Sequence, residues 1–380
     1  MVNMYINGIG KTKFGVLNET LPELAYDAMY NAIKDSDITI KDIGVIIVAN
    51  FLGGPGQEQL HLNSLIASLL PGINIPIFRI ETACASGGMA VHQGCELLEK
   101  FENVLVLGVE KLTDNSVLKV TKNLAMAGDN LGDQKEGVIF PAQYAMIANQ
   151  YIKKYGISHD DLELVSLKNH KTALKNPLAH FYYKDVDLEM IRKSPIICSP
   201  FNLFDCSPIS DGAAALVLSR KQRSKRDIKI LASEAATDTI SLSHRKGITS
   251  FKATKIASKK AYEKANISPQ DIDLAQVHDC FTISEILALE DLGFCEEGKA
   301  TKAYRENQFP LNNKLHINTD GGLIGDGHPV GATGVAQIYE VVTQLRGEAG
   351  KRQIKNAKIG LTHNIGGAGG TCVIHILEGQ

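Results

Sequence analysis

The sequence predicts an α/β protein in which layers of sheet and helix alternate. Three observations support this fold class: short apolar runs typical of strands buried on both faces, longer runs with apolar residues every three or four positions, and a weak internal repeat. With 380 residues, 44% of them hydrophobic, the chain is long enough to bury a sizeable core. Disorder is therefore not expected.

The predicted strands are short and nearly continuous in apolar residues, as strands covered on both faces should be. They are VLVLGVE (104–110), AAALVLS (213–219), KIGLTHNI (358–365) and TCVIHIL (371–377).

The predicted helices lie between these strands and show the period of an amphipathic helix. They cover residues 21–36, 89–101, 143–156, 252–266 and 334–347.

An internal repeat divides the chain into two similar halves. Residues 24–50 and 258–279 share the order helix, turn and buried strand, and Asp42-Ile43 and Asp271-Ile272 are expected to open the two strands. Each half also ends in a small-residue turn followed by a strand, at 210–219 and at 366–377. Duplication of one βαβ-rich unit explains this pattern.

The repeat sets the predicted domain boundaries. The first half covers residues 1–110 and 205–225, the second half covers 226–380, and residues 111–204 form an inserted loop domain. Residues 111–142 and 176–208 have poor periodicity and more Gly, Asp and Pro, so we expect excursions over the site. The basic run SRKQRSKRDIK (219–229) is predicted to be a solvated linker rather than a binding patch.

Charge and cysteine content exclude several classes of protein. The net charge of −2, from 40 basic and 42 acidic residues, creates no field that would attract nucleic acid or an anionic membrane. No apolar run approaches the roughly 20 residues of a membrane span, and the amino terminus does not resemble a signal peptide. Seven cysteines without a CxxC pair indicate neither a disulfide framework nor a metal site. We therefore expect a cytoplasmic protein without a metal.

Cys84 lies in ETACASGG (81–88), among small residues directly before an amphipathic run. A thiol acts as a nucleophile when it is a thiolate, and the positive end of a helix is expected to lower its pKa. The motif alone leaves open a small buried core cysteine.

His328 lies in GGLIGDGHPVGATG (321–334), before a predicted helix. Gly325, Gly327 and Gly331 allow close approach of backbone or ligand, and Pro329 prevents a helix from continuing through this point. The imidazole is a candidate to accept a thiol proton or to hold a carbonyl oxygen. The alternative is a turn histidine that faces water.

His278-Asp279-Cys280-Phe281 follows the strand pattern DIDLAQV and precedes the helix pattern 282–294. Its polar residues would then lie at the carboxyl end of a strand, where open α/β sheets bind ligands. A second thiol near Cys84 could act as acid and base. The alternative is that His278 and Asp279 only cap the next helix.

The segment THNIGGAG (362–369) ends another predicted strand. Its glycines could present backbone N–H groups to a developing oxyanion, or they could form a tight turn between paired strands.

Taken together, the Cys84 turn, GHPVGATG, SDGAAALVLS and the carboxyl-terminal glycine turn resemble the thiolase superfamily over essentially the entire chain. His278-Asp279-Cys280-Phe281 and His363-Asn364 are similar to the sterol-carrier-protein-type and archaeal acetoacetyl-CoA thiolases. Better-known thiolases have Asn-Glu-Ala-Phe and a Cys-x-Gly turn at these places.

The resemblance implies a five-layered αβαβα fold from two duplicated halves, a loop domain that helps to hold coenzyme A, and a homodimer or homotetramer. It implies acyl-CoA substrates and no other cofactor. Related archaeal enzymes also suggest HMG-CoA synthase and a zinc-ribbon/OB-fold protein as partners.

The resemblance also implies roles for individual residues. Cys84 takes the acyl group, and His328 activates it and contributes to one oxyanion hole. The backbone N–H groups of Cys84 and Gly366 form the other oxyanion hole. Asn364, which we expect to contact substrate, stands where better-known thiolases have a second cysteine. Cys280 is the expected replacement as base, and His278 is expected to hold an oxyanion-hole water.

The implied function is formation or cleavage of acetoacetyl-CoA or a longer 3-oxoacyl-CoA. The alternatives are a ketoacyl-synthase-like condensing enzyme and a non-catalytic acyl-CoA-binding scaffold. Retention of both Cys84 and Cys280 argues against a scaffold, since binding alone does not require two thiols.

Overall fold

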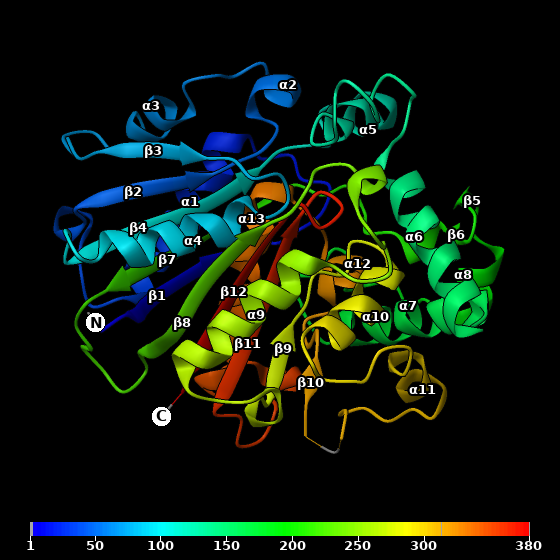
Figure 1. Cartoon of the computed structure of the whole chain (residues 1–380). Coiled ribbons are helices and arrows are strands. Elements are labelled where there is room, and N and C mark those ends of the chain that lie inside the picture. The colour runs from blue at the N-terminus through cyan, green and yellow to red at the C-terminus, as the bar shows by residue number, and fades with distance from the viewer. Residues whose placement is uncertain (1–2, 313, 380) are drawn as a thin grey trace.

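A computed structural model describes residues 3–312 and 314–379. Its main feature is a ten-stranded sheet with the order β10-β9-β11-β12-β8-β1-β7-β4-β2-β3 (Figure 1). These strands are β1 (Tyr5–Lys11), β2 (Val45–Ala49), β3 (Ile77–Ile80), β4 (Asn103–Glu110), β7 (Gly212–Ser219), β8 (Ile228–Thr237), β9 (Leu274–Gln276), β10 (His316–Ile317), β11 (Ile359–Gly366) and β12 (Thr371–Glu378). A separate hairpin is formed by β5 (Ile196–Cys198) and β6 (Phe201–Asn202).

The large sheet consists of two five-stranded halves that repeat one topology. The order β1-β7-β4-β2-β3 in one half corresponds to β8-β12-β11-β9-β10 in the other. In both halves the first three strands are antiparallel to their neighbours and the last three are parallel. The halves join where β1 pairs with β8. The predicted duplication of a βαβ-rich unit is confirmed.

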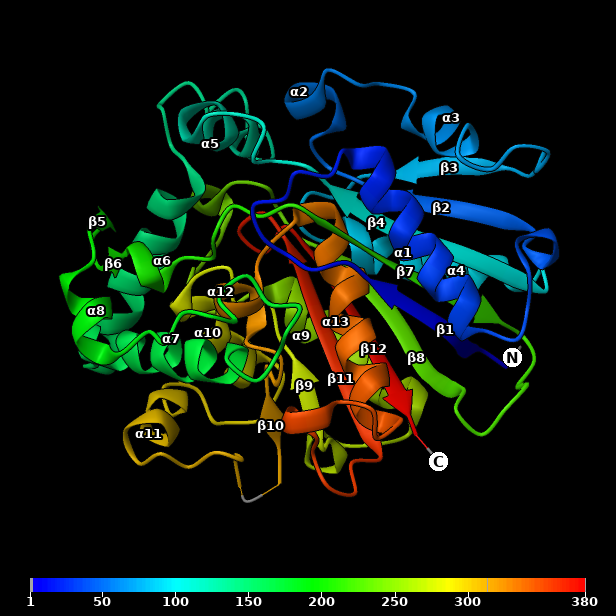
Figure 2. The same cartoon turned by 180° about the vertical axis from the view of Figure 1, so that it is seen from behind.

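The helices complete five layers. Their bounds are α1 (Leu21–Asp35), α2 (Gly53–Gln57), α3 (Leu62–Ala67), α4 (Ser86–Leu97), α5 (Val117–Ala125), α6 (Phe140–Tyr155), α7 (His159–Ala173), α8 (Leu188–Lys193), α9 (Lys252–Ala265), α10 (Thr282–Asp291), α11 (Ala300–Arg305), α12 (Gly322–Asp326) and α13 (Val330–Leu345). The layers run α1, the first half-sheet, α4 with α13, the second half-sheet, and α9. Figure 2 shows α13 running over β11 and β12. The expected αβαβα fold is confirmed.

In each half, a capped 3₁₀ turn precedes the first parallel strand. Asp42 and Asp271 were expected from the sequence to open these strands, but they instead close capping boxes with Thr39 and Ser268 in the short 3₁₀ turns. The strands begin three residues later, at Val45 and Leu274. The carboxylate accepts two otherwise unpaired hydrogens of the turn, which fixes the entry angle of the chain.

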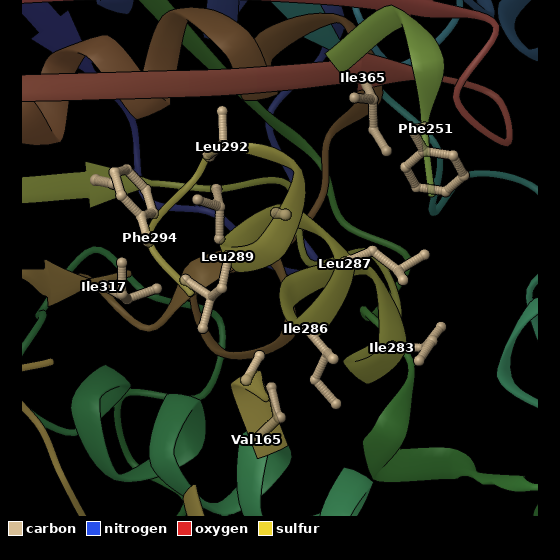
Figure 3. Packing of buried hydrophobic residues seen from close by; sticks show 14 of the residues in the cluster. Val165, Phe251, Ile283, Ile286, Leu287, Leu289, Leu292, Phe294, Ile317 and Ile365 are labelled. Carbon is tan, nitrogen blue, oxygen red and sulfur yellow. The ribbon is translucent and has the colours of Figure 1, made fainter. Parts of the chain in front are cut away.

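The insert between β4 and β7 is more regular than its sequence suggested. It contains α5, α6, α7 and α8, which gather on one side of the molecule (Figure 1). Helix α5 lies inside 111–142, a segment without clear periodicity. The insert packs on α10, all of whose residues are buried. Figure 3 shows Ile286 and Leu289 of α10 near Val165 of α7. Helix α10 thereby ties the insert to the second half-sheet.

The basic run 219–229 connects β7 to β8, and its Arg and Lys side chains between the two strands are exposed, as predicted for a solvated linker. Lys221 and Arg223 pair with Glu102, and Arg226 lies between Asp35 and Glu348. The sequence did not indicate these ion pairs, because the acceptors come from distant parts of the chain. Among the described residues, no helix is both long and apolar enough to cross a membrane.

Candidate active site

Cys84 lies in a tight turn between β3 and α4. Ala83, directly before it, adopts a left-handed conformation with φ of 52°. The Ser86 hydroxyl accepts a hydrogen bond from the Thr82 N–H at 2.9 Å and donates to the Ala83 carbonyl at 2.5 Å. A non-glycine residue in this conformation is held by its surroundings. The turn therefore presents the half-buried Cys84 from a rigid frame.

His328 lies between α12 and α13, and its ring is held by Thr333. The Thr333 hydroxyl donates to the Pro329 carbonyl at 3.1 Å, so it must accept from Nδ1–H of His328 at 2.7 Å. This bond leaves a lone pair on Nε2 of the neutral ring. His328 can therefore accept a proton at Nε2.

His278 has the opposite tautomer. The Asn364 amide donates to the Cys84 carbonyl at 3.0 Å and to Nδ1 of His278 at 3.2 Å, while its oxygen accepts from the Gly88 N–H. Because Nδ1 of His278 is an acceptor, Nε2 carries the hydrogen. That Nε2 is buried and has no partner among the described residues. It is therefore a donor with an unused hydrogen.

These groups converge although they come from distant segments. The Cys84 sulfur and a ring nitrogen each of His278 and His328 all lie within 4.8 Å of one another. The two rings are 5.2 Å apart, centre to centre, and nearly perpendicular at 85°. One thiol and two imidazoles thus meet at one point, and Nε2 is the nitrogen that Thr333 and Asn364 leave open in each ring.

Cys280 brings a second thiol to the same place. It is 6% exposed, and its sulfur lies close enough to Cys84 that each thiolate would disfavour the other. The hydroxyls of Tyr144 and Ser284 lie near the Cys280 sulfur and act to lower the pKa of its thiol. Burial, with the nearby Cys84 as the next cause, raises the pKa of Cys280 well above its usual value. A thiolate formed there is a strong base.

Asn364 has a different role from the one expected. Both of its amide hydrogens are taken by Cys84 and His278, and it is 1% exposed. No donor remains for a substrate. Asn364 is therefore a positioning residue, which holds the Cys84 turn and sets the tautomer of His278.

The glycine turn after β11 covers the Cys84 sulfur. The N–H of Gly367, one residue beyond Gly366, lies near Cys84 Sγ and acts to lower the pKa of the thiol. Gly367 has φ of 59°, a left-handed conformation that favours glycine. Gly366 itself packs against the Thr82 carbonyl, where a Cβ would lie only 2.4 Å from the oxygen. A side chain at Gly366 would therefore displace the Cys84 turn, whereas at Gly367 it is the left-handed backbone that disfavours one.

Burial makes the resting site neutral. It raises the pKa of Cys84 to about 12, more than the Gly367 N–H and other backbone donors lower it. It also lowers the pKa of His328 to about 3. The expectation that a helix terminus would lower the Cys84 pKa is wrong, because desolvation of the sulfur is the larger effect. The resting pair is a thiol and a neutral imidazole.

Two buried carboxylates hold the catalytic turns in place. Glu110, at the end of β4, accepts from the N–H groups of Leu52 and Gly331 at 2.9 Å. Asp279 accepts from Leu323 N–H at 2.7 Å, at the start of α12. Sequence reasoning did not assign these roles, although a carboxylate that ends a buried strand, as Glu110 does, is a detectable signal.

The three converging atoms do not suit a metal ion. A metal needs a lone pair from each ligand, and Nε2 of His278 presents a hydrogen because Asn364 occupies Nδ1. The arrangement instead suits an oxygen atom with a negative charge.

Comparisons with known proteins agree with this geometry. Residues 2–195 match the family "Thiolase, N-terminal domain", and residues 234–379 match "Thiolase C-terminal domain-like". An acetyl-CoA acetyltransferase of Methanothermobacter thermautotrophicus is 42% identical over the full length of both chains. Human sterol carrier protein 2 is 33% identical over 99% of this chain and 72% of its own.

Solved structures share the fold. The Ltp2-ChsH2(DUF35) aldolase has a TM-score of 0.83 at 24% identity, covering 99% of this chain and 98% of its own. Human mitochondrial 3-ketoacyl-CoA thiolase in complex with CoA has a TM-score of 0.73 at 18% identity, covering 100% and 98%.

Proposed function

Because this chain belongs to the thiolase family, we propose that it is an acyltransferase that forms or cleaves acetoacetyl-CoA or a longer 3-oxoacyl-CoA through an acyl-Cys84 intermediate. The observation that carries the proposal is the convergence of Cys84, His328 and His278, with the Cys280 thiol beside them. Relatives named acetyl-CoA acetyltransferase, 42% and 41% identical over the full chain, support it.

The first half-reaction transfers an acetyl group to Cys84. Nε2 of His328 takes the Cys84 proton as the sulfur attacks the thioester carbon. Backbone N–H groups beside the sulfur, such as that of Gly367, are placed to stabilise the oxyanion. When the intermediate collapses, the Cys280 thiol gives its proton to the departing CoA sulfur. His328 stays protonated, and Cys280 becomes a thiolate.

The second half-reaction joins two carbons. The Cys280 thiolate removes a proton from the methyl group of a second acetyl-CoA. The enolate oxygen meets Nε2–H of protonated His328 and the free Nε2–H of His278, directly or through a water. The enolate carbon attacks acetyl-Cys84, and His328 returns the proton to the released sulfur. Cys84, Cys280 and His328 thus return to their initial protonation states.

These steps use the chain's own side chains and the two thioesters. We therefore propose that the enzyme needs no cofactor. The same steps in reverse cleave acetoacetyl-CoA.

The function is tested by mixing the purified protein with acetoacetyl-CoA and analysing it by mass spectrometry. The proposal expects an acetyl group on the Cys84 peptide. CoA retention without an adduct would contradict it in favour of a binding scaffold. Turnover that depends on malonyl donors would favour a ketoacyl-synthase-like enzyme.

Acetylation of Cys84 is expected to be independent of pH from about pH 5 to about pH 9. This range lies between the pKa of His328, about 3, and that of Cys84, about 12, so the thiol–imidazole pair reacts without net proton exchange with solvent. Rapid-quench mass spectrometry with acetyl-CoA measures the rate. In a His328→Asn control the rate should instead rise about tenfold per pH unit, as for an unassisted thiol. A similar slope in the unaltered protein would refute the neutral pair.

The change Asn364→Asp is expected to slow carbon–carbon bond formation by about 10²-fold, the effect of losing one oxyanion donor. A carboxylate would accept the hydrogen of Nδ1 of His278 and leave Nε2 without one. Condensation is measured from acetyl-Cys84 and acetyl-CoA by rapid quench. The exposed Asn149→Asp serves as a control of equal charge. Unchanged condensation in Asn364→Asp would remove His278 as a donor.

We also propose that the protein forms a homodimer or homotetramer. Strand β3 ends the sheet and pairs with β2 alone among the described strands. Its other edge offers unpaired backbone groups to a second copy. Light scattering tests this: a monomer at micromolar concentration would contradict it.

Partners and location follow as further proposals. One structural neighbour is the Ltp2-ChsH2(DUF35) complex, so an accessory protein is expected here. HMG-CoA synthase and a zinc-ribbon/OB-fold protein are tested by co-purification with this chain. The seven cysteines, all within the described ranges, are free, which suits a reducing cytoplasm.

A further inference from the structure

Tyr144 is a buried tyrosine that the steps above do not use. It lies on α6, in the insert, and is 1% exposed. Its ring stacks on Phe281, the neighbour of Cys280, at 4.7 Å between centres and 26° between planes. It also meets the edge of Phe251 at 6.3 Å. These contacts hold the phenol in one orientation beside the two thiols.

The Tyr144 hydroxyl contacts both the glycine turn and the base. It donates to the Gly367 carbonyl at 2.9 Å, and it lies near enough to the Cys280 sulfur that each group shifts the pKa of the other. A phenol has one hydrogen. While that hydrogen is on the Gly367 carbonyl, the oxygen can only accept from the Cys280 thiol. This arrangement matches Cys280 before it has lost its proton.

The Cys280 thiolate requires different hydrogen-bond partners from the Cys280 thiol. It has no hydrogen to donate, and in a buried site it requires donors. The Ser284 hydroxyl is engaged with the His278 carbonyl at 2.6 Å, where it holds the histidine in place. The Tyr144 hydrogen can reach the sulfur by rotation about the C–O bond, without movement of the ring.

We propose that Tyr144 is a positioning residue for the base, whose hydroxyl turns from the Gly367 carbonyl to the Cys280 sulfur when Cys280 becomes a thiolate. The inference rests on the proposed function. The S–H bond of Cys280 breaks, its proton goes to the departing CoA sulfur, and the O–H bond of Tyr144 stays intact. Burial supports this last point, because it raises the pKa of Tyr144 well above its usual value.

The test replaces Tyr144 by phenylalanine and measures each half-reaction. Condensation from acetyl-Cys84 should fall about 10- to 100-fold, since one hydrogen bond to a charged sulfur is lost. Acetylation of Cys84 should change less than about threefold, because Cys280 only donates a proton in that step.

A second readout reports on the thiolate itself. In a Cys84→Ala background, the alkylation of Cys280 by iodoacetamide is followed by mass spectrometry of its peptide. Tyr144→Phe should slow this alkylation about tenfold at each pH between 7 and 9, because less thiolate is present. A purely structural role would not shift the alkylation rate in proportion to condensation.

Tyr262→Phe is the matched control. Its hydroxyl also donates to a backbone carbonyl, that of Leu292 at 3.0 Å. This variant should leave both the alkylation and the condensation rates unchanged. If Tyr144→Phe does not fold, 3-fluorotyrosine at position 144, a stronger donor of the same shape, should raise the alkylation rate.

The proposal is overturned if Tyr144→Phe, or the fluorinated protein, alkylates at the rate of the unaltered chain. It is also overturned if both half-reactions fall equally while alkylation is unchanged. Alkylation needs no turnover, so failure of the proposed function, seen as no acetyl-Cys84, is distinguishable from failure of this inference.

Discussion

Replacing Cys84 by alanine is expected to abolish acyl-enzyme formation and to reduce turnover by about 10⁴-fold or more. The methyl group cannot form a thioester, and among the described residues no other thiol combines the His328 base with the Gly367 N–H. The Cys280 thiol does not replace it, because its contacts are the hydroxyls of Tyr144 and Ser284. Mass spectrometry after addition of acetoacetyl-CoA measures the adduct, and a CoA-release assay measures turnover.

Cys95→Ala is the control for this experiment. Cys95 lies near the carboxyl end of α4, the helix that follows the Cys84 turn, and is buried, so the change removes a nearby sulfur away from the site. We expect it to retain the acetyl adduct and near-normal turnover. An acetyl group on another residue of the Cys84→Ala protein would contradict the assignment of the nucleophile.

Replacing Cys280 by alanine is expected to separate the two half-reactions. Acetyl-Cys84 should still form, because His328 activates Cys84 and other donors can protonate the departing CoA. Carbon–carbon bond formation should fall about 10²- to 10⁴-fold, the usual contribution of a general base. Rapid-quench measurement of the acetyl adduct, together with detection of acetoacetyl-CoA, resolves the two rates.

Cys372→Ala provides the comparison for Cys280→Ala. Cys372 lies on β12, is fully buried and belongs to the same hydrophobic cluster as Cys280. Its loss tests whether removing any sulfur from this core slows condensation. Equal condensation rates for the Cys280→Ala protein and the unaltered chain would remove Cys280 from the mechanism.

Much of the fold can be predicted from local sequence, because the patterns of strands and helices lie within contiguous stretches of the chain. The apolar runs at 104–110 and 371–377 became β4 and β12 nearly to the residue, since strands buried on both faces leave a continuous apolar pattern. The repeat of helix, turn and strand in the two halves predicted the duplicated sheet for the same reason. The helix α5 and the ion pairs of 219–229 were missed, because each has partners distant in sequence: Asn123 of α5 donates to the Pro55 carbonyl, and Arg226 pairs with Asp35.

The residues of the candidate site also fall into two groups, those with a recognisable sequence pattern and those without one. Cys84 and His328 stand out in sequence because glycines and small residues surround them, and Cys280 because it follows a buried strand. Tyr144 has no such signal. It occupies the apolar face of α6 in the same way as Tyr151, and both are buried. Only the position of α6 against Cys280 distinguishes the two.

The sequence by itself determined the two-half α/β plan, the family and the four side chains proposed for the chemistry, because each is encoded in motifs and patterns of contiguous residues. The tertiary structure decided how those side chains can act. Thr333 and Asn364 set opposite tautomers in the two histidines, and burial makes the resting thiol and imidazole neutral. Tautomer and pKa depend on hydrogen-bond partners and desolvation from segments far apart in the chain, which no local pattern contains.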